Sequence, residues 1–366
     1  MNDDRILHLI HTPRHSGAEI VVRELCLIHQ GQGLHTAIAS FNPSEDGFLD
    51  SVRHLEKSGV GIFFPKARLS GLDRIRFFRS TYDGFMPNLI YGHSVLPALY
   101  GRLALIPNSQ KRRFISVLHS ATNDDYADLK LWVSELLVAR QSDRIFAVSN
   151  KGAQSYQRRI PYHKPVEVVP NGSDLTRIRE AALQRDRNRE QLGLRPTQRL
   201  ILQIGRLSPV KQQMLSLEAL TPMLQSSGNV QLWFAGLTES APYEAALSAS
   251  IASANLQDRV KVLGSREDVP ALLSAADVYI MPSLEEAHSV ALIEALASGV
   301  AIVASNIDQF LYAESMPGVL LTAPSGKEKF AQCIESLLGA DSRFNRDLKN
   351  LDIRDVANIY SSFLKR

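Results

Sequence analysis

Residues Pro282–Ser305 read PSLEEAHSVALIEALASGVAIVAS, and this stretch decides how the second half of the chain folds. The apolar run Val290–Leu296 predicts a buried helix, which Gly299 ends because glycine readily takes the left-handed capping conformation. The β-branched run Val300–Ala304 then predicts a short strand, and the apolar segment Asp277–Met281 predicts another strand upstream. The pattern therefore predicts a strand, a helix and a second strand in succession.

Two glutamates stand within this unit. Glu286 falls in the predicted strand-to-helix crossing, and Glu294 falls about two helical turns further on. In an open parallel α/β sheet such a crossing lies at the carboxyl edge, where ligands bind. Carboxylates at that edge are acceptors for neutral hydroxyls. The alternative is an ordinary one, in which Glu286 is solvated and Glu294 lies on a helix surface.

The stretch resembles the signature of the retaining glycosyltransferases of group 1 (family 4). Two segments depart from that signature: Ala287-His288-Ser289 replaces Gly-Phe-Gly, and Ala301 stands where a proline is common. The resemblance implies an α/β fold with two Rossmann-like doubly wound domains facing a cleft (the GT-B fold) and a C-terminal helix that crosses back. The matching residues are Pro282, Ser283, Glu286, Glu294, Ala295, Ala297, Gly299 and Val303.

The rest of the 366-residue chain suits two domains. Apolar segments alternate with helical ones, which predicts mostly parallel sheets. We expect an acceptor-binding domain at 1–172, a connector at 173–198, a nucleotide-sugar-binding domain at 199–345 and a returning helix at 346–366. The predicted strands are 5–10, 34–40, 61–64, 88–91, 113–118, 144–148 and 166–169, then 199–204, 230–235, 260–263, 278–281, 300–304 and 318–321.

Composition points to a cytoplasmic globular protein. Apolar residues make up 45% and charged residues 22%, which is ordinary for a soluble domain. No apolar run is long enough to predict a transmembrane helix, and the acidic start MNDDRILHLI predicts no signal peptide. Cys26 and Cys333 lie far apart, which favours structural thiols in a reducing compartment over a disulfide or a metal framework.

Positive charge gathers in the first half. Residues 61–113 hold nine Lys and Arg against two Asp and Glu, although the whole chain is only +3. Segments 66–79 and 111–113 suggest contact with an anionic membrane surface or with a phosphorylated acceptor. The alternative is a solvated face on a core-packed helix. Without a recognition motif or a domain-wide basic excess, we expect no nucleic-acid partner.

The loop Gly205–Lys211, GRLSPVK, directly follows a predicted strand. Arg206 offers a planar fork and Lys211 a point charge, and both suit a diphosphate beside a helix N-terminus. In the resembled family this position holds the diphosphate of the donor, and we carry that role over to Arg206 and Lys211. The resemblance implies that Glu294 binds the ribose hydroxyls and that Glu286 binds the donor sugar.

Further donor-binding candidates follow neighbouring strands. Gly264 opens a loop that in the family holds the nucleotide base through backbone atoms, which requires close approach. The alternative is a plain turn with an exposed Arg266. The residues assigned to the donor, besides those named above, are Gly17, Gly205, Gly236, Gly264, Ser265, Arg266, Ala287, His288, Ser289 and Val290.

In the first half, His119 ends a buried strand and is the catalytic candidate there. It joins Arg206, Lys211 and Glu286 in the predicted catalytic set, although a strand-end histidine is more often structural. His93 is a weaker candidate for acceptor binding. The loop Thr12–Glu19 supplies Arg14 and His15 as further acceptor-binding candidates, and only its Gly17-Ala18-Glu19 matches the family.

No Gly-x-Gly-x-x-Gly follows the first strand, so no nicotinamide or flavin cofactor is expected. No Asp-x-Asp signature suggests a metal. We therefore expect a retaining, metal-independent hexosyltransferase that uses a UDP- or GDP-sugar and a glycan or lipid-linked acceptor, in bacterial surface polysaccharide assembly. Two alternatives remain: a non-catalytic paralogue that binds a glycan or a partner protein, and a nucleotide-sugar epimerase on a similar fold.

Overall fold

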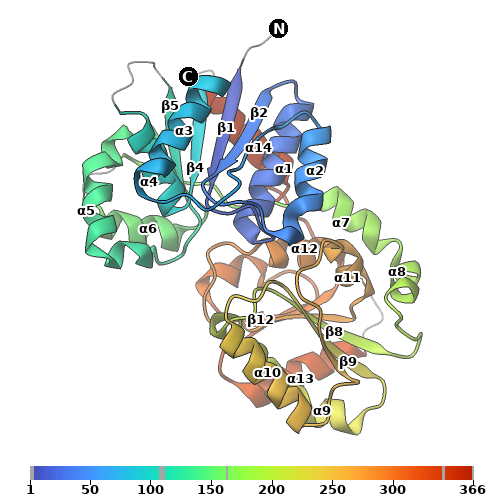
Figure 1. Ribbon diagram of the computed structural model, residues 1–366. Helices are drawn as coiled ribbons and strands as arrows, with labels where there is room; N and C mark the ends of the chain where they lie inside the picture. Colours follow the sequence, from blue (N-terminus) through green and yellow to red (C-terminus); the bar gives the residue numbers. More distant parts are fainter. Residues whose placement is uncertain (1–3, 107–111, 162–163, 340–342, 365–366) are drawn as a thin grey trace. The chain divides into compact units, whose positions relative to one another are not determined.

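The structure is a computed structural model that describes residues 4–106, 112–161, 164–339 and 343–364. The chain divides into two compact units: Met1–Gly172 with Asn350–Arg366, and Ser173–Lys349. Each unit is a parallel sheet with helices around it (Figure 1). The predicted class, two Rossmann-like doubly wound domains, is confirmed.

The first unit holds a seven-stranded parallel sheet in the order β3-β2-β1-β4-β5-β6-β7. Its strands coincide with the predicted ones within a few residues. One difference matters: the fourth strand runs on to His93, because its pairing with the next strand continues to Val117. The strands are β1 (Arg5–Ile10), β2 (His35–Ser40), β3 (Gly61–Phe63), β4 (Leu89–His93), β5 (Arg113–Leu118), β6 (Arg144–Ala147) and β7 (Val166–Val168).

The helices of this unit cover both faces of the sheet. The last one, α14, packs beside α1 (Figure 1), and the ring of His29 meets the carbonyl of Ala357 at 2.8 Å (Nε2···O). The chain therefore ends on the domain in which it began. The helices are α1 (Gly17–Gly31), α2 (Leu49–Lys57), α3 (Gly71–Phe85), α4 (Val95–Ala104), α5 (Leu129–Val138), α6 (Asn150–Arg159) and α14 (Ile353–Ser361).

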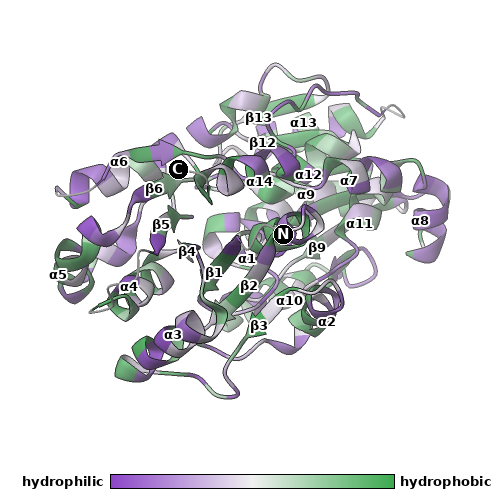
Figure 2. Ribbon diagram, turned by 90° about the horizontal axis from the view of Figure 1, so that it is seen from above, coloured by the Kyte–Doolittle hydropathy of each residue, from purple (hydrophilic) through white to green (hydrophobic). Residues whose placement is uncertain are grey.

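The two faces of this sheet have different characters. Strands β1 and β2 are buried along most of their length, and their apolar residues are green in Figure 2, as expected for strands covered on both sides. One face packs aliphatic and aromatic side chains such as Leu9, Ile90 and Phe114 against α3 and α4. The opposite face, under α1 and α14, carries buried His8, Tyr91 and other rings. Polar rings are thus enclosed in the middle of the domain.

The second unit holds a six-stranded parallel sheet in the order β10-β9-β8-β11-β12-β13. All six strands were predicted, again within a few residues. Strand β8 lies at its centre, with the next two strands of the chain on one side and the last three on the other. The strands are β8 (Arg199–Ile204), β9 (Val230–Ala235), β10 (Val260–Val262), β11 (Val278–Met281), β12 (Ala301–Ser305) and β13 (Val319–Thr322).

The helix predicted from Val290 is present as α12, and Gly299 caps it in the left-handed conformation, with φ of 76°. A side chain at Gly299 would also press on the backbone of Phe344. The helices of the second unit are α7 (Leu175–Ala182), α8 (Arg185–Gln191), α9 (Gln213–Ser226), α10 (Ala241–Ser253), α11 (Val269–Ala275), α12 (Val290–Ser298) and α13 (Lys327–Leu338).

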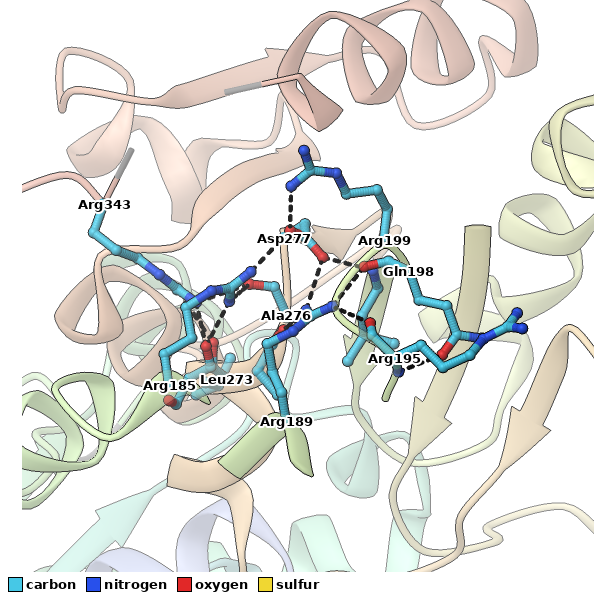
Figure 3. Close-up of polar contacts among 12 residues, drawn as sticks. Arg185, Arg189, Arg195, Gln198, Arg199, Leu273, Ala276, Asp277 and Arg343 are labelled. Atoms are coloured by element: carbon cyan, nitrogen blue, oxygen red, sulfur yellow. Dashed lines mark hydrogen bonds and ion pairs between the residues drawn. The ribbon is translucent and has the colours of Figure 1, made fainter. Parts of the chain in front are cut away.

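Asp277 fixes the predicted connector to the second unit. Its carboxylate, 5% exposed, accepts from Arg185 at 2.8 Å and from Arg189 at 3.2 Å, both on the hydrophilic helix α8 (Figures 2 and 3). It also accepts from Arg199 at 3.2 Å and from the amide of Leu200 at 2.7 Å. Residues 173–198 therefore pack as part of this domain.

Arg346 holds the start of the predicted returning segment, residues 346–366, against the second unit. Its buried guanidinium donates to the carbonyls of Pro317 at 2.8 Å and Val300 at 2.8 Å. Residues 346–349 thus stay with the second unit, and the return to the first unit begins at Asn350.

Candidate active site

The candidate site lies at the carboxyl edge of the second sheet, where the strand order reverses between β8 and β11. Open α/β sheets bind ligands at such switch points. The loop after β8 carries Arg206 and Lys211, and the loop after β11 carries Glu286. The two loops touch, because the amide of Leu284 donates to the carbonyl of Val210 at 2.9 Å.

Lys211 and Glu286 form an ion pair across the switch point. Their side chains are only 13% and 10% exposed. Ser283 adds a hydrogen bond to the same carboxylate oxygen at 2.9 Å, and Gln203 donates to the backbone carbonyl of Lys211 at 2.6 Å. The stem of Lys211 runs past Gly205, about where a side chain at Gly205 would begin. The structure thus brings together Gly205, Lys211 and Glu286, three residues that the sequence analysis selected.

Arg206 pairs with Glu239, which follows β9. Both side chains are about two-fifths exposed (41% and 42%). The backbone of the Arg206 loop is fixed separately, because Gln213 donates to its carbonyl at 2.9 Å. The sequence analysis missed Glu239, since no motif surrounds it and only the parallel pairing of β8 with β9 brings it near Arg206.

The predicted loop glycines meet at the same edge. The amide of Gly236 donates to the carbonyl of Gly264 at 2.8 Å, and a Cβ on Gly236 would lie 2.1 Å from the carbonyl oxygen of Gly205. Gly236 has φ of 151° and Gly264 has φ of 66°, conformations that favour glycine. Three neighbouring loops therefore approach one another through bare backbone.

Arg266 turns back on its own loop. Its guanidinium makes two bonds to Asp268, at 2.7 and 2.6 Å, which raises the pKa of Arg266 and lowers that of Asp268. The side chain of Arg266 thus stiffens the loop that begins at Gly264. Ser265, the remaining candidate there, is half-buried.

Glu294 lies on the second turn of α12, where Ser173 donates to it at 3.2 Å. Both Glu294 and Glu286 affect the pKa of Tyr279. Burial raises the pKa of the Tyr279 hydroxyl, and the negative charges of Glu286 and Glu294 raise it further. Because the charges of both carboxylates affect the pKa of one hydroxyl, Glu286 and Glu294 both lie near Tyr279.

The segment that departs from the family signature has defined contacts. Ser289 caps α12, accepting from the amide of Leu292 at 3.3 Å, and Val290 is the first, buried residue of that helix. His288 stacks on Tyr312 with ring centroids 5.4 Å apart, while Ala287 is half-buried. Burial lowers the pKa of His288 to about 4, so its ring is neutral at pH 7.

Tyr312 is a second residue that the sequence analysis missed. Its hydroxyl is buried and has no hydrogen-bond partner among residues 4–106, 112–161, 164–339 and 343–364. Burial raises its pKa, and the charge of Glu286 raises it further. The hydroxyl therefore lies near Glu286 with its bonding capacity unused. No sequence signal marked Tyr312, which follows β12 in a short 3-10 helix.

In the first unit, the equivalent switch point lies between β1 and β4. His119, just after β5, meets His93 with 2.9 Å between Nε2 and Nδ1. The other nitrogen of His93, Nε2, lies 2.9 Å from Nδ1 of His8. The structure argues against the acceptor-binding role predicted for His93, because it is 2% exposed and both of its ring nitrogens are engaged. The catalytic role predicted for His119 stays a prediction.

The loop after β1 lies at the same edge of this sheet. Gly17 is the first, exposed residue of α1, and buried Glu19 accepts a hydrogen bond from Ser16. His15 packs edge-on against Phe48 with ring centroids 5.2 Å apart. Arg14 is half-buried. These contacts favour a plain strand-to-helix loop, in which Glu19 serves the start of α1, over a set of open polar side chains.

Much of the basic segment is used within the fold. The helix begins at Gly71, not at residue 66, and Arg74 lies over the rings of Phe41 (4.4 Å) and Tyr100 (5.0 Å). Arg79 donates to backbone carbonyls after α4. Of segment 111–113, Arg112 and Arg113 donate to the carbonyls of Tyr82 and Phe363, while Lys111 lies outside the described residues. Lys66, Arg68 and Arg76 are exposed.

Within the described part of the chain, no cluster of three or more His, Cys, Asp or Glu side chains has a geometry that would hold a metal ion. Among the same residues, no helix is both long enough and apolar enough to cross a membrane.

Solved structures share this architecture. A crystal structure of Anabaena Alr3699/HepE in complex with UDP and glucose superposes with a TM-score of 0.76 at 20% identity, covering 98% of this chain and 95% of that one. WaaG, a glycosyltransferase involved in lipopolysaccharide biosynthesis, superposes with a TM-score of 0.70 at 14% identity, covering 98% and 95%. The fold is the two-domain GT-B fold of glycosyltransferases.

Family models match both halves of the chain. Residues 184–350 match the model "Glycosyl transferases group 1", and residues 15–177 match "Glycosyltransferase Family 4". Together the two matches take in nearly the whole sequence. The chain belongs to the group 1 glycosyltransferases, as its signature residues predicted.

Curated relatives match part of the chain. An Escherichia coli UDP-Gal:alpha-D-GlcNAc-diphosphoundecaprenol alpha-1,3-galactosyltransferase is 25% identical over 238 residues, 60% of this chain and 58% of the relative. A D-inositol 3-phosphate glycosyltransferase of Segniliparus rotundus is 28% identical over 279 residues, 72% of this chain and 61% of the relative. The match thus spans less than two-thirds of either relative.

Proposed function

We propose that this protein transfers a hexosyl group from a nucleoside diphosphate sugar, UDP- or GDP-linked, to a hydroxyl of a glycan or lipid-linked acceptor. The observation that carries the proposal is the largely buried Lys211–Glu286 pair at the β8/β11 switch point, with Arg206 in the same loop as Lys211. A cation and a carboxylate held together there suit a substrate that has both phosphate and hydroxyl groups.

Lys211 and Arg206 are proposed to stabilise the departing diphosphate. Phosphate oxygens would replace Glu286 and Glu239 as partners of the two cations. Arg206 suits this exchange because its pair with Glu239 is two-fifths exposed and therefore weak. Charge that is in place before the bond breaks contributes on the order of 3–4 kcal/mol per donor.

The two glutamates are proposed to bind the uncharged hydroxyl groups of the donor. Glu294 is proposed to accept from the ribose hydroxyls and Glu286 from the hydroxyls of the sugar, next to Tyr279, whose pKa both of them raise. The bare backbone at Gly236 and Gly264 is proposed to admit the nucleotide base and phosphates at close range. No cofactor is needed in this scheme.

The transfer is proposed to proceed with retention, as the family signature implies. A front-face attack, in which the leaving phosphate takes the proton of the acceptor hydroxyl, requires no covalent nucleophile from the protein. Arg206 and Lys211 supply the positive charge that a metal ion supplies in other transferases, which is why we propose a metal-independent reaction.

The acceptor is proposed to bind the first unit and to belong to bacterial surface polysaccharide assembly. The names of relatives support this assignment: one acts on a diphosphoundecaprenol-linked sugar, and WaaG of Escherichia coli K12 is a lipopolysaccharide glucosyltransferase (24% identical over 181 residues, 49% of this chain). His119 is the candidate side chain of the first unit for the transferred sugar or its acceptor.

Peripheral contact with the inner face of the plasma membrane is a separate part of the proposal. It depends on Lys66, Arg68 and Arg76, which are exposed, although Arg76 also pairs with Asp73 at 3.0 Å. Arg74 and Arg79 donate to backbone carbonyls instead. Co-sedimentation with anionic vesicles should fall when Arg68 and Arg76 are changed to Ala, with Arg187→Ala as the control. Binding that is unchanged in the double variant would reject this contact.

Nucleotide binding is the first test of the donor site. UDP or GDP should raise the melting temperature of the full chain, and Arg206→Ala should remove most of that rise. Arg187→Ala, which removes an exposed arginine of α8 from the same unit, should leave it intact. A protein that neither nucleotide stabilises would contradict the donor-site assignment.

Turnover separates the remaining alternatives. A screen of nucleotide sugars should show hydrolysis or, with an acceptor, transfer. A protein that binds UDP without turnover of any donor would be a non-catalytic paralogue. Interconversion of the donor sugar in the absence of an acceptor would indicate an epimerase.

A further inference from the structure

Two buried histidines and one half-buried histidine form a hydrogen-bonded chain across the switch point of the first sheet. His8 lies within β1, His93 ends β4 and His119 follows β5. Nδ1 of His8 lies 2.9 Å from Nε2 of His93, and Nδ1 of His93 lies 2.9 Å from Nε2 of His119. We call these three residues the histidine chain.

Counting protons couples the two ends of the histidine chain. A neutral imidazole carries one N–H and one lone pair, so His93 donates one of its two bonds and accepts the other. If His93 donates to His119, then His8 donates to His93, and all three rings carry hydrogen on Nδ1. If His93 donates to His8, all three carry it on Nε2. The tautomer of His119 is therefore tied to that of His8.

Burial keeps the rings of the histidine chain neutral. The pKa of His8 and of His93 is lowered well below its ordinary value, first by burial and then by neighbouring histidines. Burial lowers the pKa of His119 to about 4. An imidazolium at the centre of the chain is therefore strongly disfavoured at pH 7.

The ends of the histidine chain decide which tautomer is present. Nε2 of His8 and Nδ1 of His119 are both buried and have no hydrogen-bond partner among the described residues. If every hydrogen is on Nε2, the orphaned N–H is that of His8, which is 0% exposed among stacked rings of His29, Tyr91 and His93. Orphaned buried N–H groups are rarer than orphaned acceptors.

The alternative places the N–H at the edge of the sheet. With every hydrogen on Nδ1, His8 is left only with an unused lone pair, and the free N–H belongs to His119. His119 lies just beyond the carboxyl end of β5, the edge at which α/β sheets bind ligands. An N–H at that position has a substrate oxygen as its natural partner.

We propose that His8 and His93 are positioning residues that fix His119 as the neutral Nδ1–H tautomer, so that His119 donates a hydrogen bond to a hydroxyl oxygen of the transferred sugar or of the acceptor. The inference deepens the proposed function and rests on it for the identity of the ligand. In this role His119 orients a substrate and does not remove a proton. The tautomer itself is a property of the protein without substrate, so it is tested independently.

The first test is a direct reading of the tautomer. In the full chain labelled with ¹⁵N-histidine at pH 7, Nδ1 of His119 should have the shift of a protonated nitrogen and Nε2 that of an unprotonated one. In His93→Phe, which removes the partner, His119 should shift toward the Nε2–H form that free histidine prefers. Nε2–H at His119 in the unmodified protein would overturn the proposal, whatever the activity.

The second test is kinetic and uses isosteres. The side-chain nitrogen of Asn reaches roughly the place of Nδ1, and that of Gln roughly the place of Nε2. His119→Asn should therefore retain more activity than His119→Gln, in which kcat/KM should fall about tenfold or more, the value of one lost hydrogen bond. Equal losses in the two variants would contradict a donor at Nδ1. His54→Gln, an exposed histidine, serves as the control.

Binding measurements identify the oxygen and separate this proposal from the broader one. A contact with the transferred sugar predicts weaker binding of the nucleotide sugar in His119→Gln, with binding of the nucleotide alone unchanged. A contact with the acceptor predicts a raised KM for the acceptor only. If neither changes, the histidine chain is structural and the inference fails. If the unmodified protein binds no nucleotide at all, the proposed function fails instead.

Discussion

Replacing Lys211 by methionine tests whether the Lys211–Glu286 pair serves stability, catalysis or both. Methionine keeps the length of the apolar stem and removes the charge. In the structure it leaves the carboxylate of Glu286, 10% exposed, with the hydrogen bond from Ser283 at 2.9 Å. The variant is therefore expected to lose stability as well as activity.

The size of the stability loss follows from burial. Removing one partner of a buried ion pair costs about 3–5 kcal/mol, because the other charge remains without compensation. The Ser283 bond and the residual exposure of Glu286 lower this to about 2–3 kcal/mol. At about 2–4 °C per kcal/mol for a domain of this size, Lys211→Met should melt about 5–10 °C below the unmodified protein.

A double variant separates the two roles. Lys211→Met with Glu286→Gln removes both charges, so no carboxylate is left uncompensated and most of the melting temperature should return. Catalysis should not return, since the leaving diphosphate still lacks its cation. Turnover should stay about 10²–10³-fold down, as for other preorganised charges.

The assay pairs thermal melting with release of nucleotide from the donor sugar found by screening. Lys329→Met, which removes an exposed lysine of α13, controls for general effects of the substitution. The reasoning would be refuted if turnover followed the melting temperature, so that the double variant recovered both. Lys211 would then be a structural partner of Glu286 and nothing more.

Three further outcomes are expected. Gly236→Ala should destabilise the second unit by roughly 1–3 kcal/mol and abolish nucleotide-induced stabilisation, because its Cβ would meet the Gly205 carbonyl at 2.1 Å. Gly339→Ala is the melting control, since no atom of the described residues lies within 4 Å of its Cβ, and equal effects of the two variants would contradict the reasoning. The pKa of His288 is about 4 in the folded protein against 6.5 unfolded, so the stability that it contributes is present above pH 6.5 and is lost as pH falls toward 4. Relative to His288→Asn, the unmodified protein should lose about 2 kcal/mol of unfolding free energy between pH 7 and 5. Denaturation profiles that stay parallel over this range would count against the prediction. Tyr312→Phe should not lower the melting temperature, since the Tyr312 hydroxyl has no hydrogen-bond partner among the described residues. In calorimetry the variant should bind the nucleotide sugar more weakly and UDP equally well, and unchanged binding of the nucleotide sugar would show that Tyr312 does not belong to the site.

The sequence predicted what depends on local pattern. Most strands are apolar runs, and central ones such as β4, β9 and β12 are buried on both faces, so the strands were located from the local pattern alone. Arg206, Lys211 and Glu286 directly follow such strands, and the carboxyl ends of parallel strands share one edge. Their proximity therefore followed from topology, and the structure adds that Lys211 and Glu286 are in direct contact.

What escaped prediction depends on the packing of separate segments. Glu239 and Tyr312 reach the site through the order of strands in the sheet, which no local motif encodes. The roles of Arg74 and Arg79 were hidden for the same reason, because charge counting does not show that a guanidinium lies over Phe41 or binds a backbone carbonyl. His8 was overlooked because a single histidine in the apolar strand RILHLI matches no pattern.

The two switch points carry different kinds of polar bridge, and the difference fits what each is proposed to hold. The second sheet joins its central strands by a charged pair, Lys211 and Glu286, as needed where a diphosphate develops negative charge. The first sheet joins its strands by the neutral histidine chain, in which burial keeps every ring uncharged. A neutral N–H orients a substrate oxygen through a hydrogen bond and adds no net charge to the edge of its own sheet.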